Sequence, residues 1–183
     1  TTPWTIPANI AVAAHPEFEY VRVKAIKNDK AENLILATAL LETVLKKGRY
    51  QDYEIIERIT GDDLTKLSYD HPLKEQVPKQ KDYPHKIYLA DFVTAENTGL
   101  VHIAPGHGVE DFYLGLDHGL PVFCPVNSSG RFTEEAGTYT GGYTRDTNQE
   151  IIDDLNEEGL LLASEQLSHR YGHCWRCKTP IIY

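Results

Sequence analysis

Short apolar runs, separated by Pro, Gly and Asp, recur along most of this chain. Six of them are rich in β-branched or aromatic residues and are bounded by turn-forming residues, which is the pattern of β-strands. We therefore expect strands over residues 10–14, 18–23, 53–59, 86–92, 100–104 and 122–126.

A longer segment, residues 31–47, has the spacing of a helix. Its apolar residues, including Leu34, Leu41 and Leu45, recur at intervals of three, four and seven, and lysines close the last turn before Gly48. We expect one helix over this whole segment, ended by that glycine.

Two further helices are expected in the second half of the chain, over 109–118 and 148–158, and a glycine follows each. Thr147 and Glu150 have the spacing of a capping box at the start of the second one. Strands outnumber helices and do not alternate with them. This favours the α+β class, with a barrel-like mixed sheet core and peripheral helices, over a doubly wound parallel sheet. Residues 130–143, rich in Gly, Thr and Tyr, predict a structured loop or hairpin.

Length and composition fit a single domain, residues 1–183, cut from a larger protein. The chain starts at Thr1 without a methionine and ends inside an apolar run. No apolar stretch is long enough to span a membrane, so we expect no transmembrane helix, and we expect no secretory leader. Three cysteines make no disulfide framework, so we expect a reducing compartment.

The net charge is −9, and it is unevenly distributed. Residues 1–90 hold 13 basic and 13 acidic side chains, whereas residues 91–183 hold 5 and 14. A dedicated nucleic-acid binder is usually basic. Any nucleic-acid contact must therefore be local, and we place it on the first half.

Residues 98–112 hold several side chains that can bind a ligand, at a break between a strand and a helix. Their sequence is Thr-Gly-Leu-Val-His-Ile-Ala-Pro-Gly-His-Gly-Val-Glu-Asp-Phe. His102 lies within the strand, and Asp111 falls in the first helical turn, where the dipole favours its anion. An ionised carboxylate in a pocket suits an ammonium or guanidinium group. The structural alternatives are a buried strand histidine and a capping carboxylate. A metal site of His102, His107 and Asp111 is a third possibility, although the spacing matches no strong ligand pattern.

The opening segment, Thr-Thr-Pro-Trp-Thr-Ile-Pro-Ala-Asn, displays hydroxyls and an amide on extended, proline-stiffened backbone. These groups suit ribose, phosphate or a bound water, and a plain linker is the alternative. No nucleophile motif or phosphate-binding loop occurs, so a hydrolase built on this chain would use water as its nucleophile.

Cys174-x-x-Cys177, near His169 and His173, is half of a zinc site. Cys124 is too isolated to complete it. We expect the other pair of ligands to lie outside this chain.

Together these segments resemble the editing domain inserted into isoleucyl-tRNA synthetases. The motifs are residues 1–9 and 98–111, with further matches at 69–73 and 173–182. Valyl and leucyl relatives have Thr-Thr-Arg-Pro-Glu/Asp-Thr in the first motif and lack a histidine at the position of His102. One threonine that the family has before Thr1 is missing. The signatures of the synthetic site are absent, so no amino-acid activation is expected.

The resemblance implies the Val/Ile/Leu-tRNA synthetase editing-domain fold and hydrolysis of the ester of misacylated Val-tRNA(Ile), with Ile-tRNA(Ile) excluded. A pocket for isoleucine rejects valine by only ~1–3 kcal/mol, a limit for which isoleucyl-tRNA synthetase is itself the established example. The alternatives are a non-hydrolytic module that binds the tRNA acceptor end, and the editing domain of a sister synthetase.

Residue roles follow from the same resemblance. Asp111 would pair with the α-ammonium group of the misattached valine, and His102 would form the pocket wall that rejects isoleucine. Thr2, Thr5 and Asn9 would contact the terminal adenosine or hold the attacking water. We expect Asp111, Thr2 and His102 to be the catalytic set. Substrate-binding residues would be Thr1, Thr5, Trp4, Asn9, Ala104, Pro105, Gly106 and His107.

The implied partners are the acceptor end of tRNA(Ile) carrying valine and the remainder of the synthetase in cis. Residues 168–183 would begin the return into that remainder. No cofactor is implied for editing beyond the half-site for zinc. We expect a cytoplasmic monomer without a membrane contact.

Overall fold

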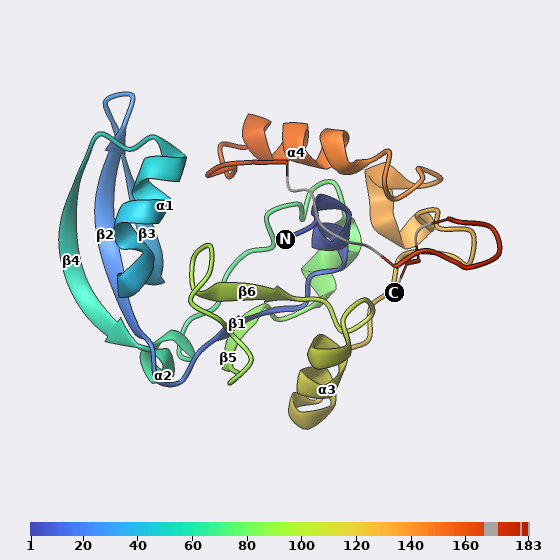
Figure 1. The fold of residues 1–183 in the computed structure, drawn as a ribbon, viewed down its shortest axis with the longest axis horizontal. Coiled ribbons are helices and arrows are strands. Elements are labelled where there is room, and N and C mark those ends of the chain that lie inside the picture. The colour runs from blue at the N-terminus through green and yellow to red at the C-terminus, as the bar shows by residue number, and fades with distance from the viewer. Residues whose placement is uncertain (167–171, 180, 183) are drawn as a thin grey trace.

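Two three-stranded sheets carry the fold in this computed structural model, which describes residues 1–166, 172–179 and 181–182 (Figure 1). Their strand orders are β5–β1–β6 and β3–β2–β4, and helices lie around them. The predicted α+β class with a mixed sheet core is confirmed. Part of the expected return segment 168–183, including His169, lies outside the described residues.

The first sheet is mixed, with β1 (Ala11–Ala14) at its centre. It pairs in parallel with β5 (Lys86–Leu89) and antiparallel with β6 (Leu100–Ile103). This register places His102 opposite Val12. The small, buried alanines of β1 let both neighbours pack closely, and the three predicted strands here are confirmed.

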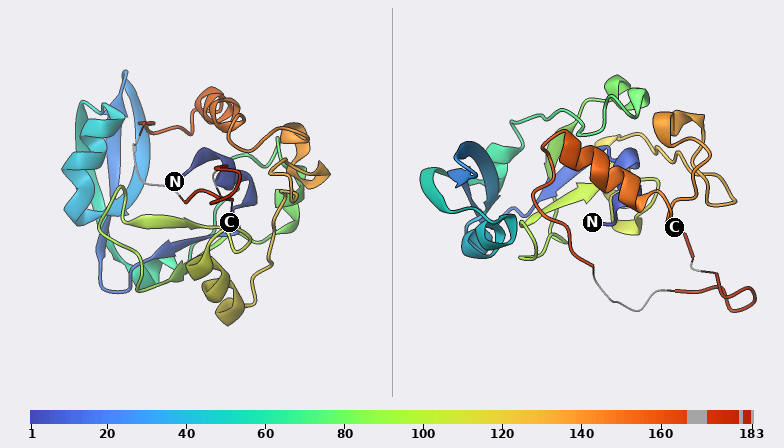
Figure 2. Two further views of the ribbon diagram at one scale, coloured as in Figure 1. Left: turned by 45° about the vertical axis from the view of Figure 1, so that its right-hand side comes forward. Right: turned by 90° about the horizontal axis from the view of Figure 1, so that it is seen from above.

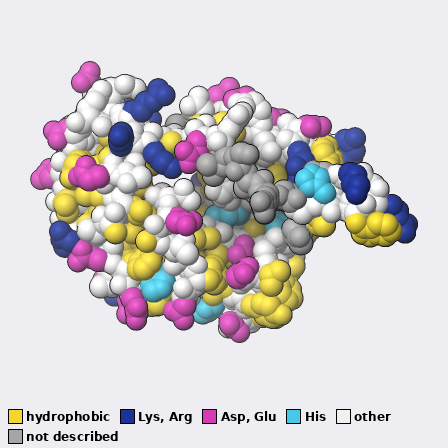
Figure 3. Space-filling view, in the orientation of Figure 1, with side chains coloured by type: hydrophobic (Ala, Val, Ile, Leu, Met, Phe, Trp, Pro, Cys, Tyr) yellow, Lys and Arg dark blue, Asp and Glu magenta, His cyan; other side chains and the backbone are white. Residues whose placement is uncertain are grey.

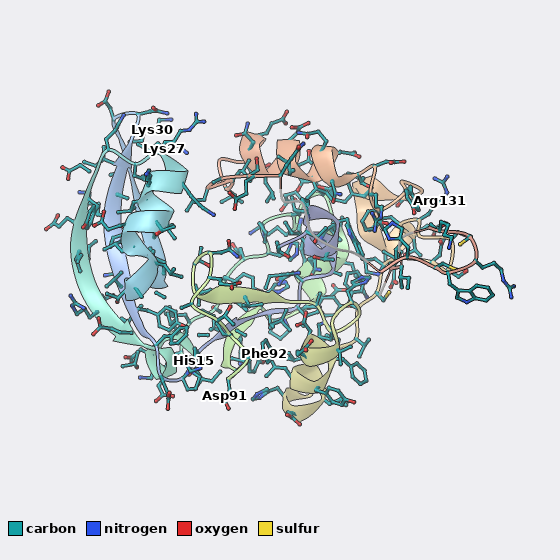
Figure 4. The ribbon with its side chains drawn as sticks, in the orientation of Figure 1. His15, Lys27, Lys30, Asp91, Phe92 and Arg131 are labelled. Atoms are coloured by element: carbon teal, nitrogen blue, oxygen red, sulfur yellow. The ribbon has the colours of Figure 1, made fainter. Side chains whose placement is uncertain are left out.

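The second sheet corrects the helix predicted over residues 31–47. Its first half is a strand, β3 (Lys30–Ala37), which pairs with β2 (Glu19–Lys27); β4 (Asp52–Thr60) covers the other edge of β2. Asn28 and Asp29 both have positive φ, 50° and 60°, as a two-residue hairpin turn requires. Lys27 and Lys30 flank this turn at the tip of the hairpin (Figure 4).

Only the end of the predicted segment is helical. After the 3-10 turn η2 (Thr38–Leu40), helix α1 (Leu41–Gly48) packs its apolar side against β2 and β3. Arg49, with φ 60°, takes the left-handed position that ends this helix, whereas Gly48 is its last helical residue. Gly48 leaves room for Tyr50, because a Cβ atom there would lie 2.4 Å from the Tyr50 ring.

The chain also forms four short helical elements: η1 (Pro3–Ala8) before β1, α2 (Gly61–Leu64) and η3 (Pro78–Asp82) between β4 and β5, and η4 (Glu134–Tyr139) after β6. The longer α3 (Val109–His118) and α4 (Asn148–Glu157) confirm the two predicted helices. Gly119, with φ 65°, ends α3 as expected. The 3-10 helix η4 and the bridge between Arg131 and Tyr143 give residues 130–143 the structured loop that was predicted.

Two local predictions are wrong. The Thr147 hydroxyl donates to the carbonyl oxygen of Tyr143 at 2.7 Å and does not cap α4. The real capping box lies between Thr60 and Asp63, at the start of α2. Residues 122–126 form no strand and keep a single bridge from Val126 to Phe132, since prolines on both sides of Phe123 remove backbone donors.

The N-terminal peptide lies in the middle of the molecule, beneath α4 (Figures 1 and 2). Trp4 is only 7% exposed and packs with Leu73, Val77 and Ile151. Its backbone N–H donates to the side-chain oxygen of Asn148 at 2.9 Å, which fixes η1 against the first turn of α4. Within the described residues, no helix is both long and apolar enough to cross a membrane.

Candidate functional site

The site begins where η1 runs into β1. The backbone N–H of Ile10 donates to the carbonyl oxygen of Ile103 at 2.8 Å, which extends the pairing of β1 with β6 by one residue. The side chains of Asn9 and His102 therefore meet, although they are 93 positions apart in the sequence. Figure 3 shows histidine side chains in the hollowed centre of this face. The two segments singled out in the sequence thus form one site.

Both ring nitrogens of His102 are engaged. The Asn9 amide nitrogen donates to Nδ1 at 3.0 Å, so the ring proton must lie on Nε2, which donates to the Thr5 hydroxyl at 3.0 Å. Burial lowers the pKa of His102 from 6.5 to about 3. The ring is therefore neutral and held in one plane, which suits a pocket wall better than a proton acceptor.

The threonine peptide is ordered by the same network. The Thr5 hydroxyl accepts from His102 and donates to the carbonyl oxygen of Thr2 at 2.9 Å. Thr1 lies at the edge of this network, with its hydroxyl 3.5 Å from that of Thr5. The structure thus gives Thr5 and Asn9 a role in holding His102. Their expected contacts with adenosine or water stay predictions.

Asp111 lies at the start of α3, where the sequence predicted it, and its carboxylate accepts from its own backbone N–H in the first turn as well as from a neighbouring strand. Its Oδ2 accepts a hydrogen bond of 2.8 Å from the backbone N–H of Ala104, at the end of β6. Burial raises the pKa of Asp111 above its usual value, so desolvation outweighs the helix dipole expected to favour the anion. A nearby cation would offset this desolvation.

The loop between His102 and Asp111 is tightly packed. A Cβ atom on Gly106 would lie 2.4 Å from the carbonyl oxygen of Phe123, and one on Gly108 would lie 2.7 Å from the Asp111 carboxyl carbon. These glycines let the backbone approach its neighbours closely. Ala104 and Pro105 are buried beside them.

His107 meets Trp4 edge to face, with ring centroids 5.0 Å apart, so the loop and the threonine peptide also contact each other here. Trp4 itself belongs to the core. Contact of Trp4, Ala104, Pro105, Gly106 or His107 with a substrate stays a prediction.

Sequence reasoning gave no role to residues 69–85, which hold the back of the site. His71 donates from Nε2 to the carbonyl oxygen of Ile6 at 3.0 Å, because its Nδ1 accepts the Leu73 N–H. Burial lowers the pKa of His71 to about 4, which keeps this ring neutral. Further contacts join Gln80 to the Pro7 carbonyl (2.6 Å), Tyr69 to the Asn9 side chain (2.5 Å) and His85 to the Ile10 carbonyl (3.3 Å). Only the match of residues 69–73 to the family motif signalled this segment.

Cavities flank the site. One of about 440 Å³ is lined by Thr1, Thr98 and apolar residues of α4 such as Leu155. Another of about 560 Å³ lies behind the threonine peptide and is lined by Tyr69 and Tyr83 among others. The first leaves one flank of the threonine peptide open.

Among the residues that the structure describes, no group of three His, Cys, Asp or Glu side chains has a metal-binding arrangement, so His102, His107 and Asp111 do not converge on one point. Cys174 and Cys177 are free thiols on one turn, and hydrogen bonds from Thr179 and then Cys174 lower the pKa of Cys177 to about 7. Two such thiols fit half of a tetrahedral zinc site.

Known proteins match this chain over its whole length. It is 62% identical to the isoleucine–tRNA ligase of Methanothrix thermoacetophila and 58% identical to those of Archaeoglobus fulgidus and Methanosarcina barkeri, with 100% of the chain covered in each case. The chain belongs to the isoleucine–tRNA ligase family. It spans 18%, 18% and 17% of the length of these three relatives, so it corresponds to a segment of such a ligase.

The fold of this ligase segment also has a solved counterpart. The crystal structure of GlLeuRS-CP1 superimposes with a TM-score of 0.65 over 91% of this chain and 82% of that one, at 15% identity. The predicted editing-domain fold is confirmed by this likeness. No protein-family model matches the chain.

Proposed function

We propose that this segment is the editing domain of an isoleucine–tRNA ligase, which hydrolyses the ester of Val-tRNA(Ile) and spares Ile-tRNA(Ile). The observation that carries the proposal is the pairing of a fixed, neutral His102 with a half-buried Asp111 on either side of one short loop. His102 would form a rigid wall of the pocket, and the Asp111 carboxylate would bind a positively charged group.

Asp111 supplies the receptor for the substrate. Its carboxylate accepts from the Ala104 N–H through Oδ2 and also from its own backbone N–H, and each carboxylate oxygen can accept a further hydrogen bond from a ligand. The α-ammonium group of an aminoacyl ester would pair with it, and this pairing would offset the desolvation that raises its pKa. Anchoring this end fixes where the ester carbonyl lies.

His102 supplies the size limit. Because Asn9 and Thr5 hold both ring nitrogens, the ring cannot swing away to admit a longer side chain. Valine would fit against it, whereas the extra methylene of isoleucine would collide. Hydroxyl groups of the threonine peptide, with Thr2 as the catalytic member, would orient the attacking water.

The partners of this reaction are the acceptor end of tRNA(Ile) and the rest of the ligase in cis. We propose no cofactor for the hydrolysis. Cys174 and Cys177 would supply two thiolates to a zinc ion whose other ligands lie elsewhere in the ligase, and that ion would have a structural role.

The test uses the full-length ligase, charged tRNA(Ile) and the variant Asp111→Ala. The wild-type ligase should release valine rapidly and isoleucine slowly, and Asp111→Ala should lower valine release at least tenfold. Attachment of isoleucine to tRNA serves as the control for an intact synthetic site. Binding of the tRNA end without any valine release would instead identify a non-hydrolytic module and overturn the proposal.

A further inference from the structure

Tyr69 lies at the junction between the cavity of about 560 Å³ and the site. Its backbone N–H donates to the carbonyl oxygen of His85 at 3.1 Å, and its ring tilts against the His85 ring with centroids 5.2 Å apart. These two contacts fix the position of the phenol. Its hydroxyl is thereby directed at the threonine peptide.

The Tyr69 hydroxyl donates to the side-chain oxygen of Asn9 at 2.5 Å. Asn9 is only 4% exposed, so its amide must find all its partners inside the protein. Its nitrogen donates to the carbonyl oxygen of Ala11 at 2.7 Å and to Nδ1 of His102 at 3.0 Å. Every polar atom of this amide is therefore engaged.

The direction of these bonds sets the tautomer of His102. Because the phenol donates to the amide oxygen, and the carbonyl oxygens of Ala11 and Ile103 face the amide nitrogen, the NH₂ end of Asn9 faces the imidazole and Nδ1 can only accept. The ring proton is then confined to Nε2 and is directed at Thr5. Burial raises the pKa of Tyr69 well above its usual range, so the phenol stays protonated and remains a donor.

We propose that Tyr69 is a positioning residue for editing, which fixes the Asn9 amide and, through it, the plane and tautomer of the His102 ring that rejects isoleucine. The inference rests on the proposed function. Tyr69 acts indirectly, because its hydroxyl is hydrogen-bonded to Asn9 and not to the substrate or to His102.

Tyr69→Phe removes the hydroxyl and keeps the ring packed on His85. The buried oxygen of Asn9 then loses its donor, and the amide is held at one end only. The His102 ring becomes less constrained, so discrimination between valine and isoleucine should fall about tenfold, the fold-change of one hydrogen bond.

Tyr83→Phe is the matched control. Tyr83 lines the same cavity, and its ring packs against Phe123 with centroids 5.5 Å apart. This variant loses one hydroxyl from the same wall and leaves the bond to Asn9 in place. Its discrimination should equal that of the wild type.

The experiment measures kcat and KM for release of valine and isoleucine from charged tRNA(Ile) by the full-length ligase. The variants are Tyr69→Phe, Tyr83→Phe, His102→Ala and the double variant Tyr69→Phe/His102→Ala. Tyr69→Phe should raise kcat/KM for isoleucine relative to valine. It should add no further change once His102 is absent, because the residue acts through that ring.

Three results would overturn the inference. Tyr69→Phe could discriminate as well as the wild type, or no worse than Tyr83→Phe. Its effect could also be the same with and without His102, as a general loss of packing would produce. A wild-type ligase that releases no valine would overturn the proposed function itself, so the two failures are distinguishable.

Discussion

The Oδ2 atom of Asp111 accepts a hydrogen bond of 2.8 Å from the backbone N–H of Ala104. This bond ties the first turn of α3 to the end of β6, two residues beyond His102. The main chain thus holds the carboxylate in place, and burial disfavours its ionised form.

Asp111→Asn should stabilise the 183-residue chain at pH 7 while abolishing valine release. The amide oxygen can still accept the Ala104 N–H, and no buried charge remains. Because burial raises the pKa of Asp111, the folded wild type binds a proton more readily than the unfolded chain just above pH 3.8. The gain in melting temperature should therefore shrink as the pH falls through the raised pKa. A variant less stable than the wild type at pH 7 would contradict this reasoning.

Gly108→Ala should displace the Asp111 carboxylate without unfolding the chain. Gly108 has φ −124°, which alanine adopts freely, yet the new Cβ would lie 2.7 Å from the carboxyl carbon. A shift of about 1 Å costs on the order of 10²-fold in rate, so valine release should fall by a similar factor.

Gly119→Ala should have the opposite effects to Gly108→Ala on stability and on valine release. It places a Cβ with nothing within 4 Å, but at φ 65°. It should lower the melting temperature and leave valine release unchanged. Equal kinetics for the two alanine variants would show that the carboxylate position does not matter.

His102→Ala should open the pocket to isoleucine. Rejection of one methylene is worth ~1–3 kcal/mol, so release of isoleucine from Ile-tRNA(Ile) should rise about 10- to 100-fold. Single-turnover rates on both charged tRNAs measure this directly. His118→Ala, on the exposed end of α3, is the control and should behave as the wild type. Unchanged discrimination would remove His102 from the wall of the pocket.

The free energy of unfolding of the 183-residue chain should decrease as the pH falls from about 6.5 to about 4. Burial lowers the pKa of His71 to about 4 and that of His102 to about 3, so the unfolded chain binds more protons in this interval. Each histidine adds a slope of up to ~1.4 kcal/mol per pH unit. Denaturant titrations at several pH values give the slope, and His71→Gln should reduce it.

Local signals in the sequence predicted most of the elements at the site. The strand through His102, the break after it and the helix that begins before Asp111 all follow from short-range patterns. The error at residues 31–47 shows the limit of such patterns. Apolar residues from Leu34 to Leu36 satisfy a helical spacing, yet the turn at Asn28 and Asp29 returns the chain alongside β2. The two positive φ values at that turn identify a hairpin, and Asn-Asp between two runs is its only sequence signal.

Sequence patterns could not predict the hydrogen bonds between the side chains of the site. Nothing in the sequence indicated that Thr5 and Asn9 contact one imidazole or that Tyr69 contacts Asn9, because these contacts span 60 to 97 positions. The dipole argument for Asp111 was incomplete for a related reason. It counted the local helix and could not count the burial that tertiary packing imposes.

The pairing of β1 with β6 also affects how this protein folds during its synthesis on the ribosome. The threonine peptide emerges before β6, because its partner His102 follows 93 residues after Asn9. Contacts this distant along a chain form late in folding. Until β6 has emerged and paired with β1, the nascent chain carries the threonine peptide but has no pocket.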